Sequence, residues 1–313
     1  MRHCGSGMRN GMRWTLGLLV GAALLIGLTA PSQAQPPQKL PSALLVFPLL
    51  QSDGFYDTRI EIVNLSGLNV EVQCFYIRDQ SCFEVGFFFE LTPHQPVSWL
   101  ASEGVFTPFT STAIPPFFGQ GELKCGVVAR QDELQFHNAI QGRATVFAQN
   151  GQTVSYGATG FQRLTEGPYT GIFSLNGSTY SSCPNRLHFQ VLTDETLPND
   201  LVLVTCDEDL ILQSPKSVNI QFQVINEFEQ AFSASIGFEC FDRRALSEVA
   251  TFFTQGTLGT DTAHIIARGV GGAVLGLGID AVEFNSTVRT AGNEGLHEGG
   301  RSATVKFPAV PLQ

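Results

Sequence analysis

Helix-forming patterns and long apolar runs are both nearly missing beyond the first 34 of the 313 residues. Without such a run no membrane-spanning helix is expected there, because about 20 apolar residues are needed to cross a bilayer. Without apolar spacing of three and four residues, amphipathic helices are not expected either. What remains is alternation with a period of two, rich in β-branched and aromatic residues, which is typical of strands. The sequence therefore predicts an all-β protein.

Positive charge is also scarce. The chain has 18 Lys and Arg against 28 Asp and Glu, which gives a net charge of −10. Proteins bind nucleic acid largely through Lys and Arg that displace counterions from phosphates, so no nucleic-acid partner is expected. The excess of acid is the ordinary composition of a well-solvated surface.

The motifs of several enzyme classes are absent. There is no Gly-x-Ser-x-Gly and no Cys-x-x-Cys. The glycine-rich run 269–278 (GVGGAVLGLG) is followed by β-branched, turn-forming residues instead of the helix that a phosphate-binding loop requires. The run 294–298 (EGLHE) lacks the second His of a zinc motif, because Arg301 stands at that place, and predicts a flexible loop. We therefore expect no catalytic, cofactor-binding or metal-ligating residue and no enzyme.

Calcium is the one cofactor for which the sequence offers ligands. Acidic residues group in loops at Asp53 with Asp57, at 194–200 and at 207–209, and calcium takes six to eight hard oxygens. None of these groups matches the loop of an EF-hand. Solvated, turn-forming acids are the interpretation that the sequence favours.

The first 34 residues have the pattern of an export signal. Arg2, Arg9 and Arg13 precede the apolar run 16–28, and small residues stand at −3 and −1 of a cleavage site after Ala34. The apolar run has 13 residues, which are too few to span a bilayer. Removing its three arginines from the 18 Lys and Arg leaves 15 against 28 Asp and Glu, a net charge of −13. We expect a secreted or periplasmic protein without a transmembrane anchor, in which residues 35–41 are a linker.

Six of the seven cysteines lie beyond that segment, and an oxidising compartment permits them to form disulfides. Cys183 and Cys206 flank a predicted hairpin of strands 187–192 and 201–205, so we expect them to pair. Cys74 pairs with Cys125 or with Cys82. Cys240 either pairs or stays buried as a small apolar residue.

Two similar halves are predicted on either side of the segment 165–185 (TEGPYTGIFSLNGSTYSSCPN), whose Gly, Ser, Thr and Pro mark a junction. The stretch 60–75 (IEIVNLSGLNVEVQCF) predicts a hairpin, and 219–241 repeats its strand, its Asn and its Cys-Phe ending. We expect two tandem immunoglobulin-like β-sandwich domains, 42–168 and 169–313, packed through Phe-rich faces at 87–89 and 252–253. Further strands are expected at 44–50, 83–91, 121–129, 143–148, 154–161, 187–192, 201–205, 217–225, 233–241, 262–267 and 302–307.

Several short motifs together resemble a family of exported bacterial proteins known mainly from genome surveys. They are CFY at 74–76, HQPVSWLASEG at 94–104, GELKC at 121–125, YSSCPN at 180–185 and VINEFEQAFSAS at 224–235 with CF at 240–241. The resemblance covers essentially the whole mature chain. It implies bacterial export and assigns no activity. Relatives are expected to carry a longer, often cysteine-containing insert between the positions of Cys74 and Cys82, so the resemblance leaves the partner of Cys82 open.

The function expected from these features is that of an exported, non-enzymatic binding or structural module that works through strand edges and loops. Its partner would be a protein or a glycan. The alternative is an extracellular carbohydrate-active or other hydrolase on a β-sandwich scaffold, which would need two facing carboxylates.

Overall fold

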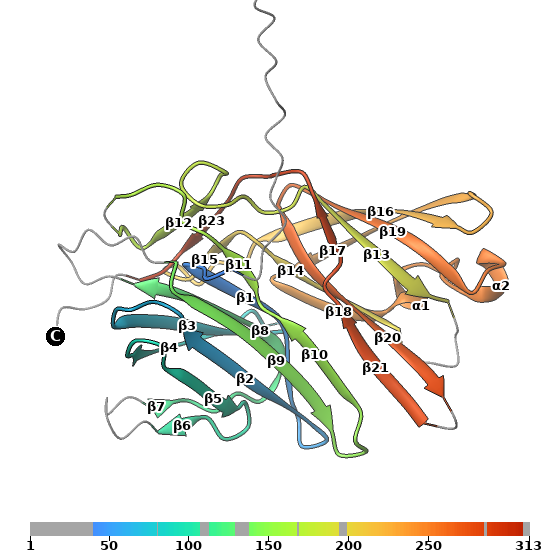
Figure 1. Cartoon of the computed structure of the whole chain (residues 1–313). Coiled ribbons are helices and arrows are strands. Elements are labelled where there is room, and N and C mark those ends of the chain that lie inside the picture. Colours follow the sequence, from blue (N-terminus) through green and yellow to red (C-terminus); the bar gives the residue numbers. More distant parts are fainter. Residues whose placement is uncertain are drawn as a thin grey trace, which may run out of the picture. The chain divides into compact units, whose positions relative to one another are not determined.

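Strands make up most of the computed structural model, as the alternating pattern predicts (Figure 1). It describes residues 40–79, 81–106, 113–128, 138–167, 169–193, 199–284 and 287–308. The predicted signal peptide and most of the predicted linker lie outside these ranges. Two single-turn helices are present in the described part, α1 (Leu246–Val249) and α2 (Gln255–Leu258).

The first half forms two antiparallel sheets, in the blue to green part of Figure 1. The five-stranded sheet has the order β11 (Thr159–Phe161), β1 (Leu44–Ser52), β8 (Gly119–Val128), β3 (Val70–Arg78) and β4 (Glu84–Leu91). The four-stranded sheet has the order β10 (Thr153–Gly157), β9 (Ile140–Ala148), β2 (Tyr56–Asn64) and β5 (Pro96–Leu100). A short ribbon of β6 (Val105–Phe106) and β7 (Ala113–Ile114) follows β5.

The second half forms two further antiparallel sheets, in the yellow to red part of Figure 1. One has the order β17 (Ala231–Glu239), β16 (Ser217–Asn226), β19 (Thr262–Val270), β13 (Arg186–Leu192) and β22 (Leu296–Glu298). The other has the order β18 (Phe241–Ala245), β14 (Asp200–Thr205), β20 (Val274–Phe284) and β21 (Thr287–Asn293). A small sheet combines β12 (Ile172–Leu175), β23 (Ala303–Lys306) and β15 (Glu208–Asp209).

The two halves have the same topology, strand for strand. The order β11-β1-β8-β3-β4 corresponds to β22-β13-β19-β16-β17, and β10-β9-β2-β5 corresponds to β21-β20-β14-β18. In both halves the corresponding strands also follow one another in the same sequence order, and every pairing within these four sheets is antiparallel. Such agreement indicates a duplicated unit. The immunoglobulin-like assignment and the boundary at residue 168 stay predictions.

Two predicted hairpins are wrong. The stretch 60–75 is divided between β2 and β3, which belong to different sheets. The two strands that lie between Cys183 and Cys206 are β13 and β14, and these also belong to different sheets. Strands that face each other across a sandwich show the same alternation as strands of a hairpin, so periodicity does not separate the two. Only the later stretch forms a hairpin, in which β16 pairs with β17 from Ser217↔Glu239 to Ile225↔Ala231.

The Phe-rich faces do not join the halves. Phe87 and Phe89 pack on Trp99 inside the first half, and the rings of Phe252 and Phe253 belong to the packing of the second half. Contact between the halves comes instead from strands that are apolar on both faces. All nine residues of β1 are buried. On β14, Val202 and Val204 join the same core cluster as β1, while Leu201 and Leu203 join the core of the second half.

Candidate functional site

The six cysteines form three disulfides. Cys74 and Cys125 face each other in register on β3 and β8, with Cα atoms 4.1 Å apart. Cys183 and Cys206 are also joined, with Cα atoms 6.6 Å apart. The pair Cys183–Cys206 was predicted from the sequence, although the hairpin used to argue for it does not exist. Cys74–Cys125 is one of the two alternatives that the sequence left open for Cys74.

The third disulfide, Cys82–Cys240, has no sequence signal of its own, because its cysteines are 158 residues apart. Cys82 follows β3, and Cys240 occupies the corner between β17 and β18. Both residues have positive φ, 48° and 44°. The backbone oxygen of Cys240 accepts a hydrogen bond from the amide of Thr205 at 3.0 Å. The bridge therefore ties the first half to the end of β14 in the second half.

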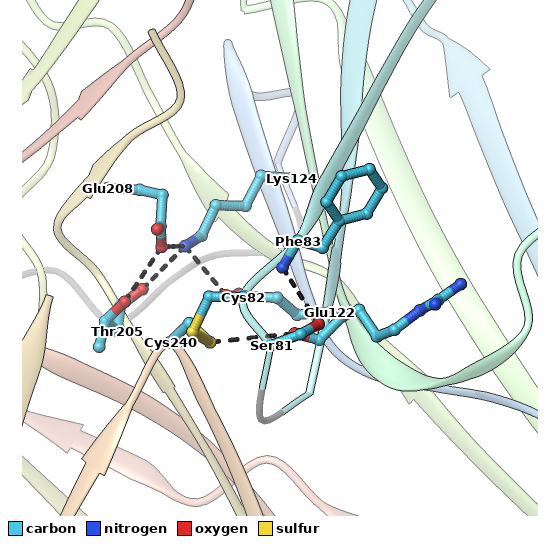
Figure 2. Close-up of a disulfide and its surroundings, with 9 residues drawn as sticks. Ser81, Cys82, Phe83, Glu122, Lys124, Thr205, Glu208 and Cys240 are labelled. Carbon is cyan, nitrogen blue, oxygen red and sulfur yellow. Dashed lines mark hydrogen bonds and ion pairs between the residues drawn. A yellow bond between two sulfur atoms is a disulfide. The ribbon is translucent and has the colours of Figure 1, made fainter. Parts of the chain in front are cut away.

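A buried group of charges lies beside this disulfide (Figure 2). The Nζ of Lys124 donates hydrogen bonds to Glu122 Oε1 at 3.1 Å, to Glu208 Oε2 at 2.8 Å and to the backbone oxygen of Thr205 at 3.0 Å. These three contacts use all donors of the ammonium group. The side chains of Lys124, Glu122 and Glu208 are 0% exposed.

Sheet register explains how charges meet in the core. Glu84 of β4 and Glu122 of β8 both lie opposite Ile77 of β3, so their side chains share one face of the sheet. Lys124 stands two residues after Glu122 and points to the same face. Glu208 comes from β15 in the second half. We call Glu84, Glu122, Lys124 and Glu208 the junction cluster.

The junction cluster holds three carboxyl groups and one ammonium group, so protons must replace part of the missing positive charge. Burial, opposed by Lys124, raises the pKa of Glu122 to about 8. Burial and the nearby Glu208 raise the pKa of Glu84 to about 7. One oxygen on each carboxyl group has no hydrogen-bond partner among the described residues. Buried in this way, the cluster is out of reach of a substrate and acts on stability.

Stability should fall as the pH rises through the range in which the junction cluster loses protons. The pKa values of Glu84 and Glu122 are raised above their usual value, so the stability that they contribute is complete below about pH 4.5 and is lost through about pH 7 to 8. The charged groups that face them are Lys124, Glu208 and Asp209. We expect the free energy of unfolding in urea to decrease between about pH 5 and pH 9.

The control for this prediction is a pair of variants. Glu84→Gln/Glu122→Gln, which cannot ionise at these positions, should show a clearly smaller decrease over the same range. Glu90→Gln, which neutralises an exposed carboxyl on the same strand as Glu84, should keep the wild-type slope. Equal slopes in all three proteins would show that the cluster does not control the pH dependence.

Strand β17 is the second candidate feature, after the junction cluster. The alternation of the sequence does not show that this strand lies at the end of a sheet. It lies at the end of its sheet, and among the described residues only β16 pairs with it. The amide of Asn226 donates to the oxygen of Gln230 at 3.1 Å. Because hydrogen-bonded pairs alternate in an antiparallel ladder, even-numbered residues of β17 bond to β16 and odd-numbered ones point their backbone groups outward. The outward residues are Ala231, Ser233, Ser235, Gly237 and Glu239.

The composition of this edge is unusual. β17 reads AFSASIGFE, with no Lys and no Pro, a single charge at its last residue and no irregularity in its register with β16. Natural sheets generally protect their edges with charge, proline, bulges or very short strands. Within the part of the chain that the structure describes, β17 therefore presents a nine-residue edge of regular register without these protections.

In the loops considered for calcium, several acidic side chains form ion pairs with Lys or Arg side chains. Asp209 pairs with Lys306 at 2.7 Å, Asp207 with Lys216 at 3.0 Å and Asp200 with Arg243 at 2.8 Å. Asp53 accepts backbone hydrogen bonds within its own turn, and residues 194–198 lie outside the described part. In the ranges that the structure describes, no group of three or more His, Cys, Asp or Glu residues lies close enough to hold a metal ion.

The run 294–298, predicted as a flexible loop, contributes β22, which pairs with β13 through Arg186↔Glu298 and His188↔Leu296. The register brings Glu298 beside His188, and the pairing of β13 with β19 brings His264 to the same place. His188 Nδ1 lies 3.2 Å from His264 Nε2, and His188 Nε2 lies 2.8 Å from Glu298 Oε2. The two histidines are 76 residues apart, so no local spacing in the sequence could indicate their contact.

Comparison with known proteins does not place the chain in a family. No family model matches it, and no curated protein does. Among solved structures there is a likeness to the crystal structure of PBSX exported protein XepA, with 10% identity, 79% of this chain and 84% of that chain covered, and a TM-score of 0.16. So low a score does not show a shared fold, and we infer nothing from it. Across the part that the structure describes, no helix has the length and apolar character needed to cross a membrane.

Proposed function

We propose that this protein is an exported, non-enzymatic binding module that captures an extended polypeptide segment by adding it as a strand to β17. The observation that carries the proposal is the unprotected edge of five outward-pointing residues. Strand addition of this kind derives affinity from backbone hydrogen bonds and specificity from alternate side chains. The export-like first 34 residues and the three disulfides support an oxidising compartment, either the periplasm or the medium.

The surroundings of β17 indicate what such a segment would look like. On the core side of the sheet Phe232 and Ile236 are only partly buried, and Phe232 stacks on Phe252 at 5.3 Å between ring centroids. An added strand would extend this apolar surface if its inward residues were apolar. On the outer side the small residues Ala231, Ser233 and Ser235 leave room for polar side chains of any size. The partner is therefore an extended segment that alternates apolar and polar residues.

A proline on the outward side of β17 tests the proposal. The amide of Ser235 points away from β16, so Ser235→Pro should remove a donor needed by an added strand while keeping the ladder to β16. As a probe we choose a labelled synthetic peptide with the alternating sequence SVNIQFQVIN, the sequence of β16. Fluorescence anisotropy should show saturable binding by the wild type and at least a tenfold weaker binding by Ser235→Pro.

Ser235→Ala is the matched control, because it keeps the backbone donor, and it should bind the peptide as the wild type does. Unfolding curves of the two variants should coincide, which would exclude a general loss of structure. Equal binding by Ser235→Pro and Ser235→Ala, or no binding by the wild type, would contradict strand addition at this edge.

A further inference from the structure

His188 and His264 lie side by side on the outer face of the sheet that ends in β17. His188 belongs to β13 and His264 to β19, which are neighbouring strands. The residues next to them in each strand are buried, so both imidazole rings point away from the core. The ring centroids are 5.3 Å apart and the ring planes are inclined by 30°. Both side chains are thus held on paired strands of a five-stranded sheet, which fixes their spacing.

The distance between the two ring nitrogens matches the span of a metal ion. Zinc binds imidazole nitrogen at about 2.0–2.1 Å with tetrahedral angles, which places two such nitrogens about 3.3 Å apart. The Nδ1 of His188 and the Nε2 of His264 are 3.2 Å apart. Two ring nitrogens at this distance need a shared hydrogen atom or a metal ion between them, because two facing lone pairs repel each other. Either an N–H of one ring donates to the other ring, or both lone pairs bind a metal ion.

Glu298 acts on the far nitrogen of His188. Its Oε2 lies 2.8 Å from His188 Nε2, and the guanidinium group of Arg186 contacts the same carboxylate at 3.3 Å. A ring N–H that donates to a carboxylate leaves the lone pair on the other nitrogen, which here is the Nδ1 that faces His264. Carboxylates placed behind a histidine in this way are the usual partners of metal-binding imidazoles, since they fix the tautomer and raise the basicity of the ring.

We propose that His188 Nδ1 and His264 Nε2 bind a divalent transition-metal ion, Zn²⁺ or Cu²⁺, while Glu298 orients His188 from behind. Imidazole suits both ions. His264 also lines an open hollow together with Gln190, Glu227 and Asp280, which gives the ion access from solvent. With two protein ligands the remaining positions are open to water or to a group from another molecule. Affinity should therefore be below that of a closed structural zinc site.

The proposal is independent of strand addition at β17 and is tested by titration with the metal alone. Isothermal titration of the tag-free protein with Zn²⁺ at about pH 7.5, where imidazole is largely neutral and able to bind a metal ion, should show one saturable site. His188→Ala and His264→Ala should each weaken the binding at least tenfold. Glu298→Gln, which leaves both ligands in place, should weaken it by about 10- to 100-fold.

His94→Ala is the matched control, because it removes an exposed histidine from a turn of the first half and should bind Zn²⁺ as the wild type does. Circular dichroism should show unchanged structure in all variants, since both ligands project from the outer face of the sheet. If only a proton joins the two rings, the wild type will show no saturable heat. That result, or an unchanged dissociation constant in His188→Ala/His264→Ala, would overturn the proposal.

Discussion

Replacing Lys124 by methionine should lower the free energy of unfolding by about 3–5 kcal/mol, the usual cost of breaking a buried ion pair by removing one partner. The ammonium group of Lys124 is fully buried and is the donor to Glu122, Glu208 and the backbone oxygen of Thr205. Methionine fills most of the same volume but supplies neither charge nor donor. The substitution therefore removes the donor to Glu122 and to the carbonyl of Thr205 and leaves Glu208 with the hydroxyl of Thr205 as its donor, at 3.1 Å. Urea unfolding followed by intrinsic fluorescence measures the loss.

The loss of stability in Lys124→Met depends on the carboxyl groups that remain in the core. Neutralising these groups therefore provides the control. In Lys124→Met/Glu122→Gln/Glu208→Gln none of the three replaced side chains can carry a charge. The triple variant should therefore recover a large part of the stability lost in Lys124→Met. Such recovery is expected because replacing a whole buried ion pair by neutral groups is often nearly neutral. A triple variant no more stable than Lys124→Met would mean that the carboxyl groups left without the lysine do not cause the loss of stability.

The fold class could be predicted from the sequence, whereas the way the strands meet could not. Period two identifies strands such as β2, β13 and β16, because one buried face imposes alternation wherever the partner strand lies. For the same reason, the alternation does not show which strands pair with each other. The echo between 60–75 and 219–241 suggested equivalent hairpins, yet topology equates β3 with β16 and β4 with β17. The duplication is visible in the order of the strands and not in the sequence similarity between 60–75 and 219–241.

The candidate sites show a further limit of the sequence. In GELKC, Glu122 and Lys124 occupy the alternate positions that a sandwich usually turns to solvent. They are buried because the second half, with Glu208, covers that face of the sheet. His188 and His264 likewise meet only through the register of β13 with β19. Side chains brought together by packing between distant segments leave no local pattern, whereas Cys183 and Cys206 are only 23 residues apart.

Removing the Cys82–Cys240 bridge should produce the second large loss of stability. By loop-closure entropy, a bridge between residues 158 apart contributes about 3–5 kcal/mol, because it restricts the unfolded chain more than a short loop does. Cys82→Ser/Cys240→Ser removes both thiols and so avoids a free cysteine that could exchange with the remaining bridges. Its urea midpoint should be well below that of the wild type under non-reducing conditions.

The position of the bridge leads to a sharper expectation than the loss alone. Cys240 accepts from the amide of Thr205, and Thr205 in turn accepts from Lys124, so the disulfide holds the end of β14 against the junction cluster. Hydrogen exchange at β8 and β15 should therefore speed up in the double-serine variant. Cys183→Ser/Cys206→Ser, which opens a bridge of separation 23, should cost less stability and leave exchange at β8 unchanged. The reverse order of stability would show that the long bridge does not secure the two halves, and that the apolar contact of β1 with β14 suffices to hold them together.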